Sequence, residues 1–145
     1  HAVDTWKDYR GITNEEFEEV YQALLKLSSK DKRFNLIRKK TSEAVSDFLD
    51  GYFDMVFIDA DHSYTGVRED ILDWLPKIRM GGLMIGHDYN YTGVRNAVES
   101  VFSQFLITRV YKTWAFEVGY SYLHMIRDDI FRRKLNKTYP KEWRK

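Results

Sequence analysis

The chain has 145 residues and a formal net charge of +1, with 43% hydrophobic and 31% charged residues, a balance that fits one globular domain and excludes collagen-like, low-complexity and disordered classes. It contains no cysteine, which excludes disulfides, thiol nucleophiles and cysteine metal sites. No apolar run approaches the roughly 20 residues of a membrane span and no secretory signal pattern opens the chain, so we expect a cytoplasmic protein without membrane contact.

Strand-like and helix-like segments alternate along the chain. In order, we expect a strand over residues 2–4, a helix over 14–28, a strand over 34–37, a helix over 41–49, a strand over 53–58, a helix over 65–75, a strand over 83–85, a helix over 94–102, and two adjacent strands over 106–111 and 114–118, with 122–126 extending that pattern. These assignments depend on the spacing of apolar residues, at helical period in the helices and in short continuous runs in the strands.

Local signals set several of these bounds. Asn14 is predicted to cap the first helix, and Thr41 or Ser42 the second. Residues 55–58 are all apolar, as is typical of a strand that is covered on both faces. Residues 76–82 begin with proline and end with two glycines, which favours a loop.

Alternating strands and helices with short connections indicate an α/β fold, a doubly wound and mostly parallel sheet. In such sheets, ligands bind outside the carboxyl ends of the strands. Polar or aromatic residues follow three of the predicted strands: Asp4, Thr5 and Trp6; Asp59, Asp61, His62 and Ser63; and His87, Asp88 and Asn90. We therefore expect the functional site at this edge.

The first of these strand ends has two interpretations. Asp4 is placed to accept hydrogen bonds from both hydroxyls of a ribose, with Trp6 covering an adenine face. Alternatively, Asp4 caps a turn and Trp6 packs in the core. A nicotinamide cofactor would also suit Asp4, but its binding requires a glycine-rich loop.

The other two strand ends offer metal binding or proton transfer. Asp59, Asp88 and Asn90 supply oxygen ligands for a hard divalent ion. His62 or His87 can act as a base near neutral pH. Asp61 and Ser63 are interpreted instead as the cap of the following helix.

Aromatic and basic residues complete the candidates. Tyr89 and Tyr91 are candidates for the walls of a pocket. Residues 127–145 carry eight Lys or Arg against three acids, which we interpret as a solvated terminal helix rather than a nucleic-acid contact. The aromatic residues of the closing strands are expected in the core or in a homo-oligomer contact: Tyr111, Trp114, Phe116, Tyr120 and Tyr122.

Residues 53–90, FDMVFIDADHSYTGVREDILDWLPKIRMGGLMIGHDYN, resemble the class I S-adenosylmethionine-dependent methyltransferases. The resemblance is strongest to a branch of small-molecule and sugar O-methyltransferase-like proteins, through the elements IDADHSY, GG and GHDYN. Residues 2–6, AVDTW, match the second-strand signature of that branch. The resemblance covers residues 2–102 and, more loosely, the closing strands to 118.

This resemblance implies a Rossmann-like sheet of seven strands, the last one antiparallel. It implies that Asp4, Thr5 and Trp6 bind the ribose and adenine of S-adenosylmethionine. Thr41 and Ser42 fall where the family places polar contacts to adenine, and Asp59 falls beside the methionine part and the reacting methyl. In cation-dependent relatives, acids at the positions of Asp59 and Asp88 hold a divalent metal such as Mg²⁺, here with Asn90 as a third ligand.

The implied function is methyl transfer from S-adenosylmethionine to an oxygen of a small molecule or sugar, with catalytic residues drawn from Asp59, His62 and His87. We expect residues 1–126 to form the methyltransferase domain and 127–145 a basic tail. The family's first strand and glycine-rich loop would precede residue 2, so we expect an N-terminal truncation and weak cofactor binding by these residues alone. The alternatives are a metal-dependent phosphoesterase that uses Asp59, His62, His87 and Asp88, and a non-catalytic association domain.

Overall fold

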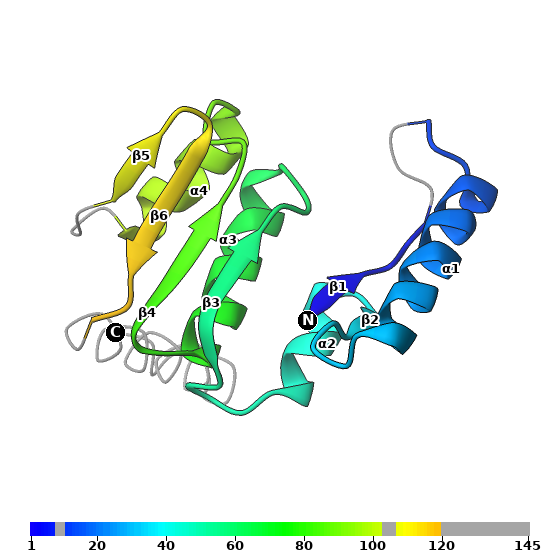
Figure 1. Cartoon of the computed structure of the whole chain (residues 1–145). Helices are drawn as coiled ribbons and strands as arrows, with labels where there is room; N and C mark the ends of the chain where they lie inside the picture. Colours follow the sequence, from blue (N-terminus) through cyan, green and yellow to red (C-terminus); the bar gives the residue numbers. More distant parts are fainter. Residues whose placement is uncertain (8–10, 103–106, 120–145) are drawn as a thin grey trace, which may run out of the picture. The chain divides into compact units, whose positions relative to one another are not determined.

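The structure is a computed structural model that describes residues 1–7, 11–102 and 107–119. The chain divides into two compact units, His1–Phe48 and Leu49–Lys145 (Figure 1). The predicted strand extension over 122–126 and the basic tail lie outside the described residues.

The first unit is a small parallel sheet with helices in its connections. Its elements are β1 (Ala2–Asp4), α1 (Asn14–Lys30), β2 (Leu36–Arg38), α2 (Thr41–Ala44) and a 3₁₀ turn, η1 (Val45–Asp47). β1 and β2 pair in parallel, with Asp4 opposite Arg38 at their carboxyl ends. Among the described helices, none is both long and apolar enough to cross a membrane.

Two predicted helix caps in this unit are wrong. α1 is capped by Thr13 rather than Asn14, because the Thr13 hydroxyl accepts from the Glu16 N–H and the Glu16 carboxylate accepts from the Thr13 N–H. This reciprocal arrangement is a capping box, which satisfies two otherwise unpaired donors. α2 follows Lys40, which makes no side-chain cap, so Thr41 and Ser42 are helical residues rather than caps. The predicted helix over 41–49 is one short α-helix followed by η1.

The second unit contains a four-stranded sheet in the order β3-β4-β6-β5. Its elements are β3 (Phe53–Ile58), α3 (Tyr64–Trp74), a 3₁₀ turn η2 (Leu75–Lys77), β4 (Ile78–Gly86), α4 (Thr92–Phe102), β5 (Thr108–Val110) and β6 (Thr113–Glu117). β3 is parallel to β4, and β6 is antiparallel to both of its neighbours. Three strands therefore run one way and β6 alone is reversed, which confirms the mostly parallel sheet with an antiparallel closing strand.

α3 and α4 cover the same face of this sheet (Figure 1). The sheet side chains that are buried on that face include Met84 and Phe116, which pair across β4 and β6. Met55 and Phe57 alternate onto the other face, and each remains 53% exposed. Within the described residues of this unit, only one face of β3 is covered by helices, and the cover of its other face stays a prediction.

β4 is longer than predicted, because residues 78–82 belong to the strand and not to a loop. Ile78 pairs with Phe53, and the register then shifts, so that Leu83 pairs with Met55. Gly81 takes a φ of +72°, a conformation that glycine adopts at little cost, within the irregularity. Pro76 stands in η2, where its fixed φ suits the start of a helical turn.

Candidate functional site

The carboxyl ends of β3 and β4 bring two polar loops together. β3 ends at Ile58 and β4 at Gly86, and these two residues are partners in the ladder. The His87 N–H donates to the Ile58 carbonyl oxygen at 3.1 Å, which extends the pairing past the last strand residue. Asp59 and His87 therefore leave the sheet side by side, and the residues that follow them share one edge.

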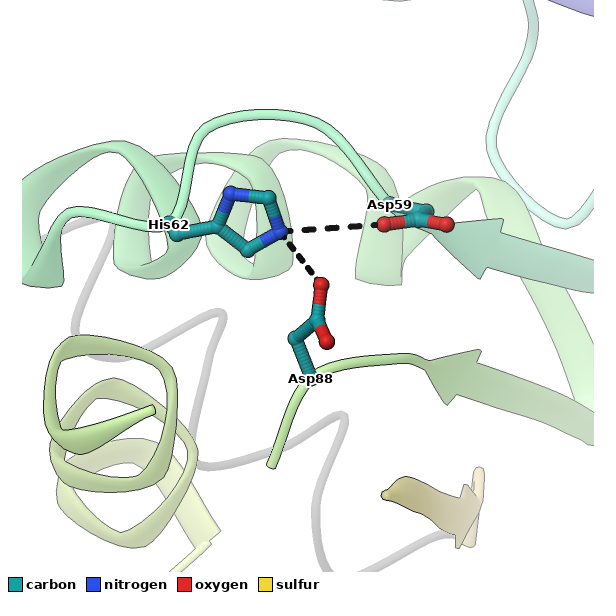
Figure 2. A group of neighbouring side chains, drawn as sticks. All are labelled: Asp59, His62 and Asp88. Carbon is teal, nitrogen blue, oxygen red and sulfur yellow. Dashed lines mark hydrogen bonds and ion pairs between the residues drawn. The ribbon is translucent and has the colours of Figure 1, made fainter. Parts of the chain in front are cut away.

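At this edge His62 meets two carboxylates (Figure 2). Its Nε2 lies 2.6 Å from Asp88 Oδ2 and 3.9 Å from Asp59 Oδ1. The side chains of His62 and Asp88 are 16% and 18% exposed, whereas that of Asp59 is 47% exposed. The His62–Asp88 contact is thus the short, shielded interaction of the cluster, and Asp59 is its solvent-facing member.

Asp88 also serves a second histidine. Its Oδ1 lies 3.2 Å from His87 Nδ1, so one carboxylate lies between two imidazoles. Burial raises the pKa of Asp88, but the hydrogen bond from His62 and the charges of His87 and His62 outweigh it and leave the pKa below its ordinary value. Asp88 is therefore an anion at neutral pH, which orients both histidines.

The backbone of Asp88 is in the left-handed region, with a φ of +54°. This conformation costs an ordinary residue about 1–2 kcal/mol, although aspartate tolerates it better than most. The Tyr91 N–H closes the turn by donating to the Asp88 carbonyl oxygen at 2.9 Å. This turn aims the carboxylate at His62 instead of continuing the direction of β4.

Asp61 and Ser63 have the capping role that the sequence predicts. The Ser63 hydroxyl accepts from the Gly66 N–H at 3.1 Å and caps α3, while Asp61 accepts from both the N–H and the hydroxyl of Ser63. These hydrogen bonds, those from Ser63 first, hold the pKa of Asp61 below its ordinary value. Asp61 is thus committed to the start of α3.

A small, partly open pocket of about 10 Å³ lies at the same edge. A pocket of this size holds about one water molecule. Its lining combines the polar loops with the core: Ile58, Asp59, Ala60, Asp61, His62, Val67, His87, Val94 and Trp114.

A metal site is also compatible with the cluster. Among the described residues, Asp59, His62 and Asp88 each offer a ligand atom, and these atoms lie within 4.8 Å of one another. Asn90, the predicted third ligand, is exposed in the turn before α4, and its role as a ligand stays a prediction. An imidazole among the ligands favours a transition metal over Mg²⁺, which prefers oxygen ligands.

In the first unit, Asp4 lies at the end of β1 and its Oδ1 accepts from the Trp6 N–H at 2.7 Å. Trp6 has a φ of +46° and is only 5% exposed, with its ring 5.1 Å from that of Tyr21. Asp4 therefore caps a turn and Trp6 packs in the core, as the second of the two interpretations of this strand end expected. The carboxylate of Asp4 is still on an exposed residue, where a ribose can reach it.

The remaining predicted cofactor residues are also in this unit. The Thr5 carbonyl oxygen accepts from Arg38 Nε at 3.3 Å. Thr41 is the half-buried first residue of α2, and Ser42 is exposed beside it. Their contacts to adenine remain predictions.

Three residues of the site have roles that the sequence did not reveal. Tyr91 was expected as a pocket wall, but its ring lies against the imidazole of His62. Gly93 adjoins the carbonyl oxygen of His62 so closely that a side chain would collide with it. Tyr89 is buried and its hydroxyl is 2.7 Å from Glu99, so it supports the loop rather than a pocket.

Residues 1–89, more than half of the chain, match the model of a family described as a methyltransferase domain. An uncharacterised protein of Sinorhizobium fredii, y4gI, is 32% identical over 90 residues, which are 60% of this chain and 10% of that protein. The chain thus spans about a tenth of the length of this curated relative.

A solved structure shares the α/β fold. It is a protein of Corynebacterium glutamicum determined as a structural genomics target, with a TM-score of 0.60 and 13% sequence identity. The similarity covers 81% of this chain and 59% of that one.

Proposed function

Because the chain belongs to the methyltransferase-domain family, within the class I S-adenosylmethionine-dependent methyltransferases with their Rossmann-like α/β fold, we propose that its protein methylates an oxygen atom of a small-molecule or sugar acceptor. The observation that carries the choice of oxygen is the 2.6 Å contact of Asp88 with His62, a residue that lines the small pocket at the strand ends. An acceptor hydroxyl must lose its proton when it is methylated, and an Asp-oriented histidine is suited to take it.

The residues of the first unit fit the cofactor. Asp4 ends a parallel strand with a carboxylate, which can accept hydrogen bonds from a ribose diol. Its Oδ1 is already bonded to the Trp6 N–H at 2.7 Å, so the carboxylate is held in a fixed orientation before any ligand arrives. Preorganisation of this kind lowers the cost of binding.

When bound, S-adenosylmethionine supplies an electrophilic methyl group on its sulfonium. His62 accepts the proton of the acceptor hydroxyl at Nδ1, because Nε2 is the nitrogen that lies 2.6 Å from Asp88, and Asp88 stabilises the resulting imidazolium. Asp59, 3.9 Å from the same ring, adds a second negative charge. The acceptor oxygen would then bond to the methyl carbon as the carbon–sulfur bond of the cofactor breaks, and S-adenosylhomocysteine would leave.

We assign the base to His62 rather than His87 on geometry. His62 contacts two carboxylates and its side chain is 16% exposed, whereas the side chain of His87 lies 3.2 Å from Asp88 and is 37% exposed. Electrostatic stabilisation of the cation is stronger where water is excluded. His87 then helps to hold Asp88 as an anion.

A divalent cation is the alternative means of activating the acceptor. Asp59, His62 and Asp88 would hold it, and it would lower the pKa of a hydroxyl bound to it. In that case His62 is a ligand and not a base. The family match leaves the phosphoesterase interpretation without support, because methyl transfer accounts for the same residues.

The test compares two histidine variants of the purified protein. Release of S-adenosylhomocysteine is measured with a panel of simple phenols and hexoses, and cofactor binding by calorimetry. We expect His62→Asn to lower turnover by about 10²- to 10⁴-fold with unchanged cofactor affinity, and His87→Asn to have a smaller effect.

Three results would contradict this assignment. No cofactor binding and no turnover by the natural protein would remove the proposed activity. A larger loss in His87→Asn than in His62→Asn would move the base to His87. Loss of turnover in EDTA, with recovery on addition of Mn²⁺ or Mg²⁺, would replace the base by a metal.

A further inference from the structure

The ring of Tyr91 lies against the imidazole of His62. The ring centroids are 5.3 Å apart and the planes are inclined by 33°. Tyr91 is 43% exposed, so its other side is open to solvent while this side covers His62. Contact at this distance and tilt is typical of an offset aromatic pair.

Tyr91 and Asp88 belong to one short segment, and both reach His62. The Tyr91 N–H donates to the Asp88 carbonyl oxygen, and the Tyr91 carbonyl oxygen accepts from the Arg95 N–H, each at 2.9 Å. The second of these bonds fixes Tyr91 at the start of α4. The ring and the carboxylate are therefore presented to His62 from one turn, which is closed on one side and attached to a helix on the other.

Gly93 completes the support of His62 from its backbone side. A Cβ at this position would lie 2.4 Å from the His62 carbonyl oxygen and 3.1 Å from the Tyr64 nitrogen. The first turn of α4 thus lies directly on the backbone of the His62 loop, with no space for a side chain. A small shift of α4 would move the His62 loop with it.

We infer that Tyr91 is a positioning residue that holds the imidazole of His62 in the plane in which it meets Asp88. The torsion that rotates an imidazole is broad, so packing must select one orientation. The 2.6 Å contact with Asp88 restrains one ring nitrogen, and the Tyr91 ring restrains the face. The effect of this restraint on catalysis rests on the proposed function of His62 as the base. The restraint of the ring does not depend on that function.

The contact involves the aromatic face, so the variants separate the ring from the hydroxyl. Tyr91→Leu removes the ring and Tyr91→Phe keeps it. Tyr64→Leu is the matched control, because Tyr64 is 44% exposed and also stands at the start of a helix, α3. Histidine ring resonances are recorded by NMR, with His62 assigned among the four histidines by loss of its signals in His62→Asn.

In Tyr91→Leu we expect the His62 ring protons to move downfield, away from the shielding face of the tyrosine, and to broaden as the ring samples more orientations. Turnover falls by about tenfold to about hundredfold, as for a misplaced catalytic group, while the KM for S-adenosylmethionine is unchanged. Tyr91→Phe stays within about twofold of the parent, and Tyr64→Leu matches the parent in both measurements.

Unmoved His62 resonances in Tyr91→Leu would overturn the inference, even if turnover falls. Equal losses in Tyr91→Phe and Tyr91→Leu would overturn it too, because the hydroxyl would then be the active part. If the resonances move but His62→Asn retains full activity, the proposed base is wrong and the positioning contact stands. A Gly93→Ala variant that shifts the same resonances would support the backbone part of the inference independently.

Discussion

His62 and Asp88 are 26 residues apart in sequence, yet Nε2 of one and Oδ2 of the other lie 2.6 Å apart. The two loops that carry them follow β3 and β4, which are parallel neighbours and end at the same edge. Their contact is therefore a consequence of sheet topology and of the left-handed turn at Asp88.

The role of this carboxylate is tested by Asp88→Asn. The amide keeps the size of the side chain but removes the charge that stabilises a protonated His62. We expect turnover to fall by about 10²- to 10⁴-fold, with the affinity for S-adenosylmethionine unchanged. Single-turnover methyl transfer and calorimetry measure the two quantities, and a loss confined to cofactor affinity would refute the role.

The ribose interaction is tested by Asp4→Asn. A hydrogen bond to a charged group contributes about 1.5–3 kcal/mol, so the affinity for S-adenosylmethionine should fall by about tenfold to about hundredfold. Isothermal titration of the parent protein and of Asp4→Asn with S-adenosylmethionine measures this affinity. Asp31→Asn, at the C-terminal cap of α1 in the same unit, is the control and should bind as the parent does. Equal affinities of Asp4→Asn and the parent would exclude Asp4 from the cofactor site.

Packing beneath the pocket is tested by Gly86→Ala. A Cβ on Gly86 would lie 2.4 Å from the Trp114 ring, which is 1% exposed. We expect a loss of about 1–3 kcal/mol in the free energy of unfolding, measured in urea. Gly119→Ala is the control, since no atom of the described residues lies within 4 Å of a Cβ there. A Gly86→Ala protein as stable as Gly119→Ala would show that the Trp114 ring is not fixed.

The capping box of α1 predicts a pH dependence. Hydrogen bonds from the N–H and the hydroxyl of Thr13 lower the pKa of Glu16 from its ordinary value of 4.5. The contribution of a carboxylate with a lowered folded-state pKa is present above the unfolded-state pKa and is lost as the pH falls through the folded-state value. We therefore expect the first turn of α1 to fray below about pH 4.5.

Backbone carbon chemical shifts of residues 14–17 between pH 6 and pH 3 measure this fraying. Glu16→Gln keeps the hydrogen bonds without the titration, because glutamine also serves in a capping box. Its first turn should show a smaller change over the same range. Identical titration curves in Glu16→Gln and the parent would assign the change to other carboxylates.

The regular elements could be predicted where one signal dominates. The helical period identifies α1, α3 and α4, and the apolar run identifies β3. β4 could not be placed correctly, because Pro76 and Gly82 indicate a loop locally. The strand nevertheless begins at Ile78 through its pairing with Phe53, and long-range pairing of this kind leaves no signal in the local pattern.

The candidate site could be predicted only to the level of its strand ends. The rule that parallel strands share a carboxyl edge brings Asp59, His87 and Asp88 together before any coordinates are known. Which partners pair could not be predicted, because that depends on the backbone of Asp88, whose φ of +54° no residue pattern signals. The contact of Tyr91 with His62 follows from the same turn.

Trp114 lines the pocket and is shielded from water. An indole in that place is a built-in optical reporter, since its fluorescence responds to a neighbouring imidazole that gains charge or to a molecule that enters. The difference in fluorescence between the parent and a Trp114→Phe variant would isolate the Trp114 signal from that of the other three tryptophans of the chain. This signal would follow occupancy of the pocket in real time.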